Sequence, residues 1–151
     1  VTFIPVDTAG DMHSAVNREL ASSTILIMSA AVSDFMPAEK SGEKIEKSDE
    51  LFLKLTGTPD ILSAVGKKKN RPFIVGFAAE TGRKLEKARK KLKHKNMDLI
   101  VFNDVTEAGS GFDVETNKVV LIDKKKESEL PLLNKDDVAD AILDRIGELR
   151  A

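Results

Sequence analysis

The chain has 151 residues, of which 41% are apolar and 32% charged, and its formal net charge is −1. A chain of this size and composition is typical of one globular domain, so we predict a single domain over residues 1–151 and exclude a disordered protein. The near-neutral charge argues against a nucleic-acid-binding protein, and the absence of cysteine excludes disulfides, thiolate nucleophiles and cysteine-ligated metals.

The first predicted elements are a strand, a helix and a second strand. Residues 1–6 are apolar enough for a strand, and the following helix begins after Thr8, which forms a capping box with Asp11. Residues 23–28 form a short continuous apolar run, which is typical of a strand buried on both faces of a parallel sheet.

A polar segment interrupts this pattern. Residues 33–50 carry many charges and little periodicity, which predicts a long loop or flap, and residues 51–55 resemble a strand. A short helix follows, with Thr58 as its N-cap and Pro59 at its first position. Its predicted buried face comprises Ile61, Leu62 and Val65.

The second half of the chain returns to strands and helices in alternation. Strands are predicted at 73–77 and 99–102, and a very basic helix lies between them, from about residue 82 to residue 95. A β-hairpin follows, with arms at 118–122 and near 130–132. The last helix begins after Asn134, and its predicted apolar face comprises Val138, Ala141, Ile142, Ile146 and Leu149.

This alternation predicts a layered, Rossmann-like α/β fold with a mostly parallel sheet, to which a flap and a β-hairpin excursion are added. In such a sheet, ligands bind beyond the carboxyl ends of the strands. Functional residues are therefore expected directly after the strands.

Three predicted strands end in small or polar residues. Small residues let a ligand approach the backbone closely, a carboxylate accepts hydrogen bonds from hydroxyl or amino groups, and Phe77 offers an aromatic surface for a base or ribose. The alternative is that alanine and glycine only relieve crowding where helices cross the sheet, but three adjacent ends of this kind favour a ligand site. The three runs are Ser29-Ala30-Ala31-Val32-Ser33-Asp34, Ala78-Ala79-Glu80-Thr81 and Asn103-Asp104.

The basic helix is the second indication of a ligand. Eight lysines or arginines and one glutamate lie between Arg83 and Lys95. Lys91 and Lys95 are neighbours on one helix face, where two ammonium groups repel each other unless an anion lies between them or their stems diverge. In a protein of near-neutral charge, this excess indicates a phosphate-bearing ligand; the alternative is a solvated face whose lysine stems cover apolar surface.

The flap and the remaining motifs carry weaker signals. A lysine-bearing flap beside a nucleotide pocket can close over a reacting phosphate, although an ordinary polar loop is the alternative. Gly109-Ser110-Gly111 lacks the third glycine of a dinucleotide-binding fingerprint, so a tight turn is the better interpretation. With only His13 and His94 and no serine elbow, a Ser-His-Asp hydrolase and a histidine-rich metal site are disfavoured.

Taken in order, motifs along essentially the whole chain resemble one family, the bacterial phosphopantothenoylcysteine synthetases, which usually form the C-terminal half of a bifunctional coenzyme A biosynthesis protein. The most specific of them are the block around Asp34 and the block around Phe77. The motifs are Ser29-Ala30-Ala31-Val32-Ser33-Asp34-Phe35-x-Pro37, Glu43-Lys44-Ile45, Thr58-Pro59-Asp60-Ile61-Leu62, Val75-Gly76-Phe77-Ala78-Ala79-Glu80-Thr81, Lys95-x-x-Asp98-Leu99-Ile100-x-x-Asn103-Asp104-Val105, Gly111-Phe112 and Leu130-Pro131-Leu132.

The resemblance implies a CTP-dependent ligase. The carboxylate of 4′-phosphopantothenate would attack the α-phosphate of CTP and release pyrophosphate, and the amine of cysteine would then attack the acyl cytidylate to give 4′-phosphopantothenoylcysteine and CMP. Lys44 would be the catalytic lysine of the flap. The implied nucleotide-binding residues are Met28, Ser29, Ala30, Asp34, Pro59, Asp60, Ile61, Leu62, Phe77, Lys91 and Lys95.

The resemblance also implies partners. It implies Mg2+ bound together with CTP, without assigning a metal ligand, and no tightly bound organic cofactor in this domain. It further implies a homodimer and an associated flavin-dependent decarboxylase domain. No apolar run approaches the ~18 residues of a membrane span, so we expect no membrane partner. The absence of cysteine suits a cytoplasmic protein, and the near-neutral charge disfavours a nucleic-acid partner.

Two features depart from the family pattern. The family flap reads Lys-x-Lys-Lys, whereas this chain reads Lys44-Ile45-Glu46-Lys47, and because Lys44 is retained we expect nucleotide activation to survive. The family also begins with a strand, a phosphate-binding turn and a helix, including an asparagine that acts in the second half-reaction. We find no counterpart before Val1, so we expect the chain to lack about one strand–helix–strand unit.

Two alternatives to the ligase stay open. One is a catalytically incomplete nucleotide-binding or dimerisation fragment, in which the flap and the hairpin hold two chains together. The other is a dinucleotide-dependent oxidoreductase, which the missing glycine fingerprint disfavours.

Overall fold

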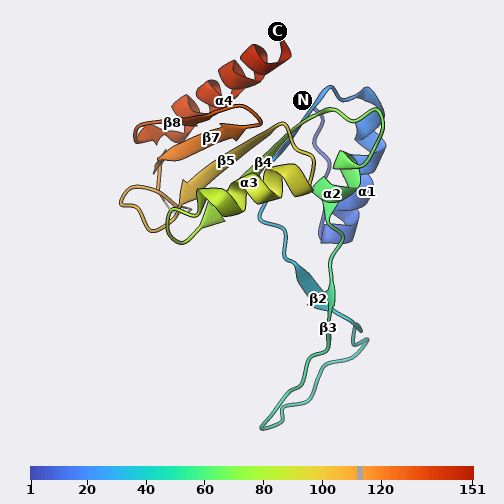
Figure 1. Ribbon diagram of the computed structural model, residues 1–151. Helices are drawn as coiled ribbons and strands as arrows, with labels where there is room; N and C mark the ends of the chain where they lie inside the picture. Colours follow the sequence, from blue (N-terminus) through green and yellow to red (C-terminus); the bar gives the residue numbers. More distant parts are fainter. Residues whose placement is uncertain (112–113) are drawn as a thin grey trace.

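The computed structural model describes residues 1–111 and 114–151 and has a five-stranded sheet with helices on both faces (Figure 1). Strands β1 (Ile25–Met28), β4 (Phe73–Glu80) and β5 (Leu99–Asp104) run parallel, and β7 (Val119–Asp123) and β8 (Glu127–Glu129) continue the sheet in antiparallel pairing. The strand order is β1-β4-β5-β7-β8. The predicted layered α/β fold is confirmed, and the predicted hairpin extends one edge of the sheet.

The helices divide between the two faces of the sheet. They are α1 (Ala9–Glu19) with a short 3-10 turn at Leu20–Ser22, α2 (Ile61–Gly66), α3 (Leu85–His94) and α4 (Lys135–Arg150). The first three pack on one face and α4 packs on the other, as Figure 1 shows.

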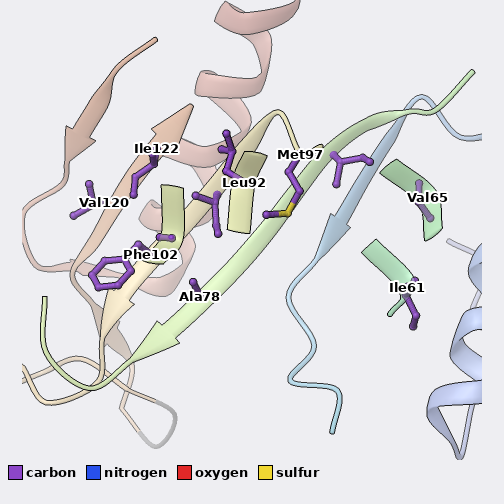
Figure 2. Close-up of a cluster of buried hydrophobic side chains, with 11 residues drawn as sticks. Ile61, Val65, Ala78, Leu92, Met97, Phe102, Val120 and Ile122 are labelled. Carbon is purple, nitrogen blue, oxygen red and sulfur yellow. The ribbon is translucent and has the colours of Figure 1, made fainter. Parts of the chain in front are cut away.

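Strand alternation builds a separate apolar layer on each face. On the face of α1, α2 and α3, Ala78 of β4 and Phe102 of β5 meet Leu92 of α3, and Figure 2 shows this cluster with Met97 among its members. On the opposite face, Val101 of β5 packs in the cluster that includes α4. The predicted apolar face of α4 is confirmed in its buried members, Val138, Ile142 and Ile146.

Side chains fix where the helices begin and end. The predicted capping box is present: the Thr8 hydroxyl accepts the Asp11 N–H at 3.1 Å, and the Asp11 carboxylate accepts the Thr8 N–H at 3.0 Å. At α2 the N-cap is Asp60 rather than the predicted Thr58, because the Asp60 carboxylate accepts the backbone N–H of Ser63 at 3.0 Å. Asn96, with φ of 50°, follows the C-cap of α3 in the left-handed region that asparagine tolerates.

Helices α2 and α3 end in close contact. The Asn96 side-chain amide donates to the Gly66 carbonyl oxygen at 2.8 Å. A Cβ added to Gly66 would lie 2.1 Å from the Lys95 carbonyl oxygen, so only glycine fits at the end of α2. This contact sets the distance between the two helices that flank the candidate site.

Two small antiparallel ribbons lie outside the main sheet. Strands β2 (Phe35–Pro37) and β3 (Leu55–Gly57) pair with each other, and the chain between them projects away from the body of the molecule (Figure 1). Strands β6 (Thr116–Asn117) and β9 (Leu133–Asn134) form the other ribbon.

Four sequence predictions need correction. Residues 1–6 form no strand: the sheet begins at β1, and most of these residues lie exposed without joining it. As an edge strand, β1 is also not buried on both faces, and Ile27 is 42% exposed. The predicted loop at 33–50 contains β2, and only Leu55 of the predicted strand at 51–55 is a strand residue, because the antiparallel pairing of β2 with β3 runs from Phe35 opposite Gly57 to Pro37 opposite Leu55.

The second arm of the predicted hairpin lies at β8 rather than near 130–132, because a tight turn at 124–126 brings the chain back after three residues. Among the described residues, no helix has the length and apolar character needed to cross a membrane.

Candidate functional site

A cavity of about 940 Å³ lies at the carboxyl ends of the parallel strands β1, β4 and β5. Its walls come from three parts of the chain that are distant in sequence: the segment after β1, the start of α2, and α3. A fourth wall comes from α4 on the other face of the sheet. The position agrees with the expectation that ligands bind beyond the carboxyl ends of parallel strands.

All eleven residues expected to bind nucleotide line this one cavity. The end of β1 and the segment after it contribute four of them, the start of α2 contributes four, β4 contributes one and α3 with its C-cap contributes two. They are Met28, Ser29, Ala30 and Asp34; Pro59, Asp60, Ile61 and Leu62; Phe77; and Lys91 and Lys95.

Lys44 lies elsewhere. It belongs to the exposed chain between β2 and β3, which projects from the body in Figure 1. Lys44 is not among the residues that line the cavity. The structure therefore brings the expected nucleotide-binding residues together without the expected flap lysine.

The two lysines of the basic helix diverge toward different carboxylates. Lys91 Nζ lies 3.0 Å from a carboxylate oxygen of Glu80, and Lys95 Nζ lies 3.1 Å from the carboxylate of Asp60. This arrangement relieves the repulsion expected between two ammonium groups one helical turn apart. Both pairs lie on the lining of the cavity.

Glu80 is the more enclosed of these carboxylates, with its side chain 10% exposed. It also accepts a hydrogen bond from Lys87 Nζ at 2.7 Å. The Lys87 hydrogen bond is the main cause of a lowered pKa of Glu80, assisted by Lys91 and opposed by burial. Glu80 therefore carries its negative charge at neutral pH.

Asp60 combines two tasks. Burial alone would raise its pKa, but hydrogen bonds from the Ser63 N–H and hydroxyl and from Lys95 outweigh that effect and lower it. The same carboxylate thus caps α2 and holds Lys95 at the cavity.

Strand alternation places the aromatic and amide groups on the other side of the sheet. Phe77 packs in the cluster that includes α4, and Asn103, which is 8% exposed, occupies the same face of the neighbouring strand β5. In the described part of the chain, the buried Oδ1 atom of Asn117 has no hydrogen-bond partner. The cavity therefore has a charged side next to α3 and a less charged side next to α4.

The sequence reasoning did not predict the wall from α4 and the neighbouring ribbon. The periodic apolar residues of α4 predicted a face that packs on the sheet, but such a pattern does not show which of its positions border a cavity. The lining residues that the prediction missed here are Asn117, Lys135, Val138, Ala139 and Ile142.

Two smaller expectations concern glycines. Gly76, which lies in the motif around Phe77, makes room for the core, because a Cβ there would lie 2.5 Å from the sulfur of Met97. Gly109 adopts φ of 79°, in keeping with a tight turn, and Gly111 lines the cavity. Phe112, part of the Gly111-Phe112 motif, lies outside the described residues.

The charged side suits a phosphate chain. Lysines 91 and 95 supply the cations, and their two carboxylate partners also border the cavity. The described residues contain no cluster of three or more histidine, aspartate or glutamate side chains that could hold a metal ion by themselves. Both carboxylates on this side are held by lysines, Asp60 by Lys95 and Glu80 by Lys87 and Lys91, so the structure assigns no magnesium ligand.

Comparison with known proteins agrees with the expected family. A family model described as the DNA/pantothenate metabolism flavoprotein C-terminal domain matches residues 1–149. Over 149 residues the chain is 46% identical to the coenzyme A biosynthesis bifunctional protein CoaBC of Bacillus subtilis (strain 168), covering 97% of this chain and 37% of that protein. It is 43% identical over 152 residues to the protein of the same name from Vibrio cholerae serotype O1, covering 98% of this chain and 38% of that protein.

The chain spans less than two fifths of the length of these relatives. Its fold is similar to a crystal structure of the C-terminal domain of the coenzyme A biosynthesis bifunctional protein CoaBC, with a TM-score of 0.80 and 37% identity. That match covers 99% of this chain and 68% of the other.

Proposed function

Because this chain belongs to the family of DNA/pantothenate metabolism flavoprotein C-terminal domains, we propose that it carries the nucleotide site of a CTP-dependent ligase that joins 4′-phosphopantothenate to cysteine. The relatives are bifunctional proteins of coenzyme A biosynthesis, and the proposed reaction is a step of that pathway. One observation carries the proposal: the eleven residues expected to bind nucleotide surround one cavity at the carboxyl ends of the strands.

The proposed reaction has two steps. The carboxylate of 4′-phosphopantothenate attacks the α-phosphorus of CTP, the bond to the β-phosphate bridging oxygen breaks, and pyrophosphate leaves. The amine of cysteine then attacks the acyl carbon, an amide forms after loss of a proton, and CMP leaves. Magnesium, when bound with the triphosphate, neutralises phosphate charge and orients the phosphate oxygens.

The chain's own residues bind and orient the nucleotide. Lys91 and Lys95 compensate the charge of the triphosphate, since ammonium groups from one helix reach the same side of the cavity. Phe77 supplies an apolar contact on the other side, and Asp34 accepts hydrogen bonds from the nucleotide's hydroxyl or amino groups. A cavity of about 940 Å³ is large enough for a nucleotide together with a second substrate.

The ribbon of β2 and β3 extends the proposal to a homodimer. We define the arm as residues 35–57, which hold a group of large apolar side chains that are exposed although they are costly to leave in water. A second copy of the chain would cover them, and the same contact would bring the segment of Lys44 into a defined position. The exposed apolar residues of the arm are Phe35, Met36, Ile45, Leu51, Phe52, Leu53 and Leu55.

The arm also favours a second candidate function. A dimerisation fragment without chemistry would show the same exposed apolar surface. The two candidates differ in nucleotide turnover, because only the ligase releases pyrophosphate from CTP when 4′-phosphopantothenate is added. The relatives' larger size leads us to propose further that a flavin-dependent decarboxylase domain accompanies the ligase.

Thermal unfolding with and without CTP and magnesium tests the nucleotide site. A ligand that binds the folded state stabilises it and so raises Tm. At a free ligand concentration of one hundred times Kd, the added free energy of unfolding is about 2.7 kcal/mol. We expect Lys91→Ala to lose most of this shift, whereas Lys93→Ala, an exposed lysine of the same helix outside the cavity lining, retains it. No shift in the unaltered protein at millimolar CTP contradicts the nucleotide site.

A further inference from the structure

The charged side of the cavity contains a carboxylate to which the proposed reaction assigns no role. Glu80 ends β4, and its carboxylate bridges two lysines of α3, with Lys87 at 2.7 Å and Lys91 at 3.0 Å. Glu80 and Lys91 line the cavity, and Lys87 stands outside that lining. In the described structure these two lysines are the hydrogen-bond partners of the carboxylate.

A negatively charged carboxylate repels a triphosphate that binds beside it. The carboxylate reduces the charge of the group formed by Glu80, Lys87 and Lys91 from +2 to +1. It also competes with any bound phosphate for the Lys91 ammonium. Both effects weaken the binding of free anions, and they act most strongly on the most highly charged ones.

Lys87 makes an exchange of partners feasible. The Glu80 side chain is only 10% exposed, and leaving a carboxylate in such a place without a cationic partner costs free energy. Lys87 lies one helical turn before Lys91 and donates the shorter of the two hydrogen bonds. When Lys91 turns toward a phosphate, Glu80 therefore retains a cationic partner.

We propose that Glu80 is a positioning residue, which holds Lys91 at the cavity and sets the charge of the phosphate subsite so that pyrophosphate is released after it forms. The inference rests on the proposed function, in which pyrophosphate is the leaving group. Without Glu80 the subsite holds one more unit of positive charge, and the product would dissociate more slowly.

Glu80 is a cleaner position to test than Asp60, although both pair with a lysine of the cavity. Asp60 caps α2, so its replacement disturbs a helix. Among the described residues, the Glu80 side chain hydrogen-bonds only to the two lysines, and glutamine preserves its shape while removing its charge.

The experiment measures the binding of sodium pyrophosphate and of CMP by calorimetry. We expect Glu80→Gln to bind pyrophosphate roughly three- to tenfold more tightly than the unaltered protein, with CMP affinity changed by less than about twofold. Lys87→Gln should act in the opposite direction, because Glu80 then depends on Lys91 alone. Matched controls are Glu86→Gln, whose side chain is 85% exposed, and Lys90→Gln, both on the outer surface of α3.

Each outcome decides the inference. Pyrophosphate affinity in Glu80→Gln that is unchanged, weaker or undetectable overturns it, as does an equal gain for CMP, which would indicate a general change in the cavity. If circular dichroism shows that Glu80→Gln is unfolded, Lys87→Gln decides: weaker pyrophosphate binding than in Lys90→Gln supports the inference, and equal binding overturns it. The proposed function fails separately, when the unaltered protein shows no response to CTP.

Discussion

Lys95 Nζ lies 3.1 Å from the Asp60 carboxylate, so one ion pair joins the C-cap of α3 to the N-cap of α2. The carboxylate also accepts the Ser63 N–H at 3.0 Å and the Ser63 hydroxyl at 2.8 Å. A lysine proposed to bind phosphate is therefore held by the residue that starts the neighbouring helix. This relationship ties the geometry of the site to the local stability of α2.

Substitution of Asp60 separates its capping role from its charge. We expect Asp60→Ala to lower the free energy of unfolding by about 1 kcal/mol, since the backbone N–H of Ser63 loses its acceptor. Asp60→Asn keeps an oxygen for the cap and should lose less than half of that amount. Urea unfolding at neutral pH measures both, and equal losses in the two variants would contradict the capping role.

A second ion pair predicts pH-dependent stability. Arg71 Nη2 donates to Asp98 Oδ1 at 2.8 Å, and the Ile74 N–H donates to Asp98 Oδ2 at 2.9 Å, which joins the beginnings of β4 and β5. Burial would raise the pKa of Asp98, but these hydrogen bonds outweigh it and hold the pKa below its ordinary value. The stabilisation is therefore complete above the unfolded pKa of about 3.9 and is lost as the pH falls through the lower folded value.

The variant Asp98→Asn tests this dependence. We expect it to lower the free energy of unfolding by about 2–3 kcal/mol at pH 7, because Arg71 loses its charged partner. The difference from the unaltered protein should shrink as the pH is lowered below about 4, because Asp98 then binds a proton in the unfolded chain before it does so in the folded protein. Urea unfolding at pH 7, 5 and 3 measures it, and a difference that stays constant over this range would contradict the assignment.

Two glycines in helices predict opposite effects of alanine. A Cβ at Gly66 meets the Lys95 carbonyl oxygen at 2.1 Å, so Gly66→Ala must push α2 away from the end of α3 and should destabilise the protein by about 1–3 kcal/mol. A Cβ at Gly147 meets nothing within 4 Å, and Gly147→Ala should stabilise α4 by roughly 0.5–1 kcal/mol. Thermal unfolding compares them directly, and a Gly66→Ala protein as stable as the unaltered one would show that α2 and α3 are not tightly packed.

Local patterns predicted much of the fold because the residues that define them are neighbours in sequence. The apolar runs gave the positions of β4 and β5, and Thr8 with Asp11 gave the start of α1. The position of the cavity could be predicted for a different reason, because parallel strands bring their carboxyl ends to one edge of the sheet even when they are distant in sequence.

The errors arise where the decisive partner is distant in the chain. Thr58 and Asp60 are both plausible N-caps, and only the backbone geometry of α2 selects Asp60. The apolar run of β1 cannot reveal that it lies at a sheet edge, which depends on the order of strands. The partners of Lys91 depend in the same way on the packing of α3 against the end of β4.

The arm of residues 35–57 leads to a prediction about assembly. Leu53 on the arm and Leu143 on α4 are similarly exposed, at 60% and 53%, so the same substitution at each compares two surfaces with equal starting accessibility. If the arm mediates the proposed homodimer, Leu53→Asp should weaken association at least about tenfold, because a carboxylate would be buried in an apolar contact, whereas Leu143→Asp should leave it unchanged. Sedimentation velocity over a range of concentrations measures the dissociation constant. A monomeric unaltered protein at high concentration, or weaker association in Leu143→Asp but not in Leu53→Asp, would exclude the arm as the dimer contact.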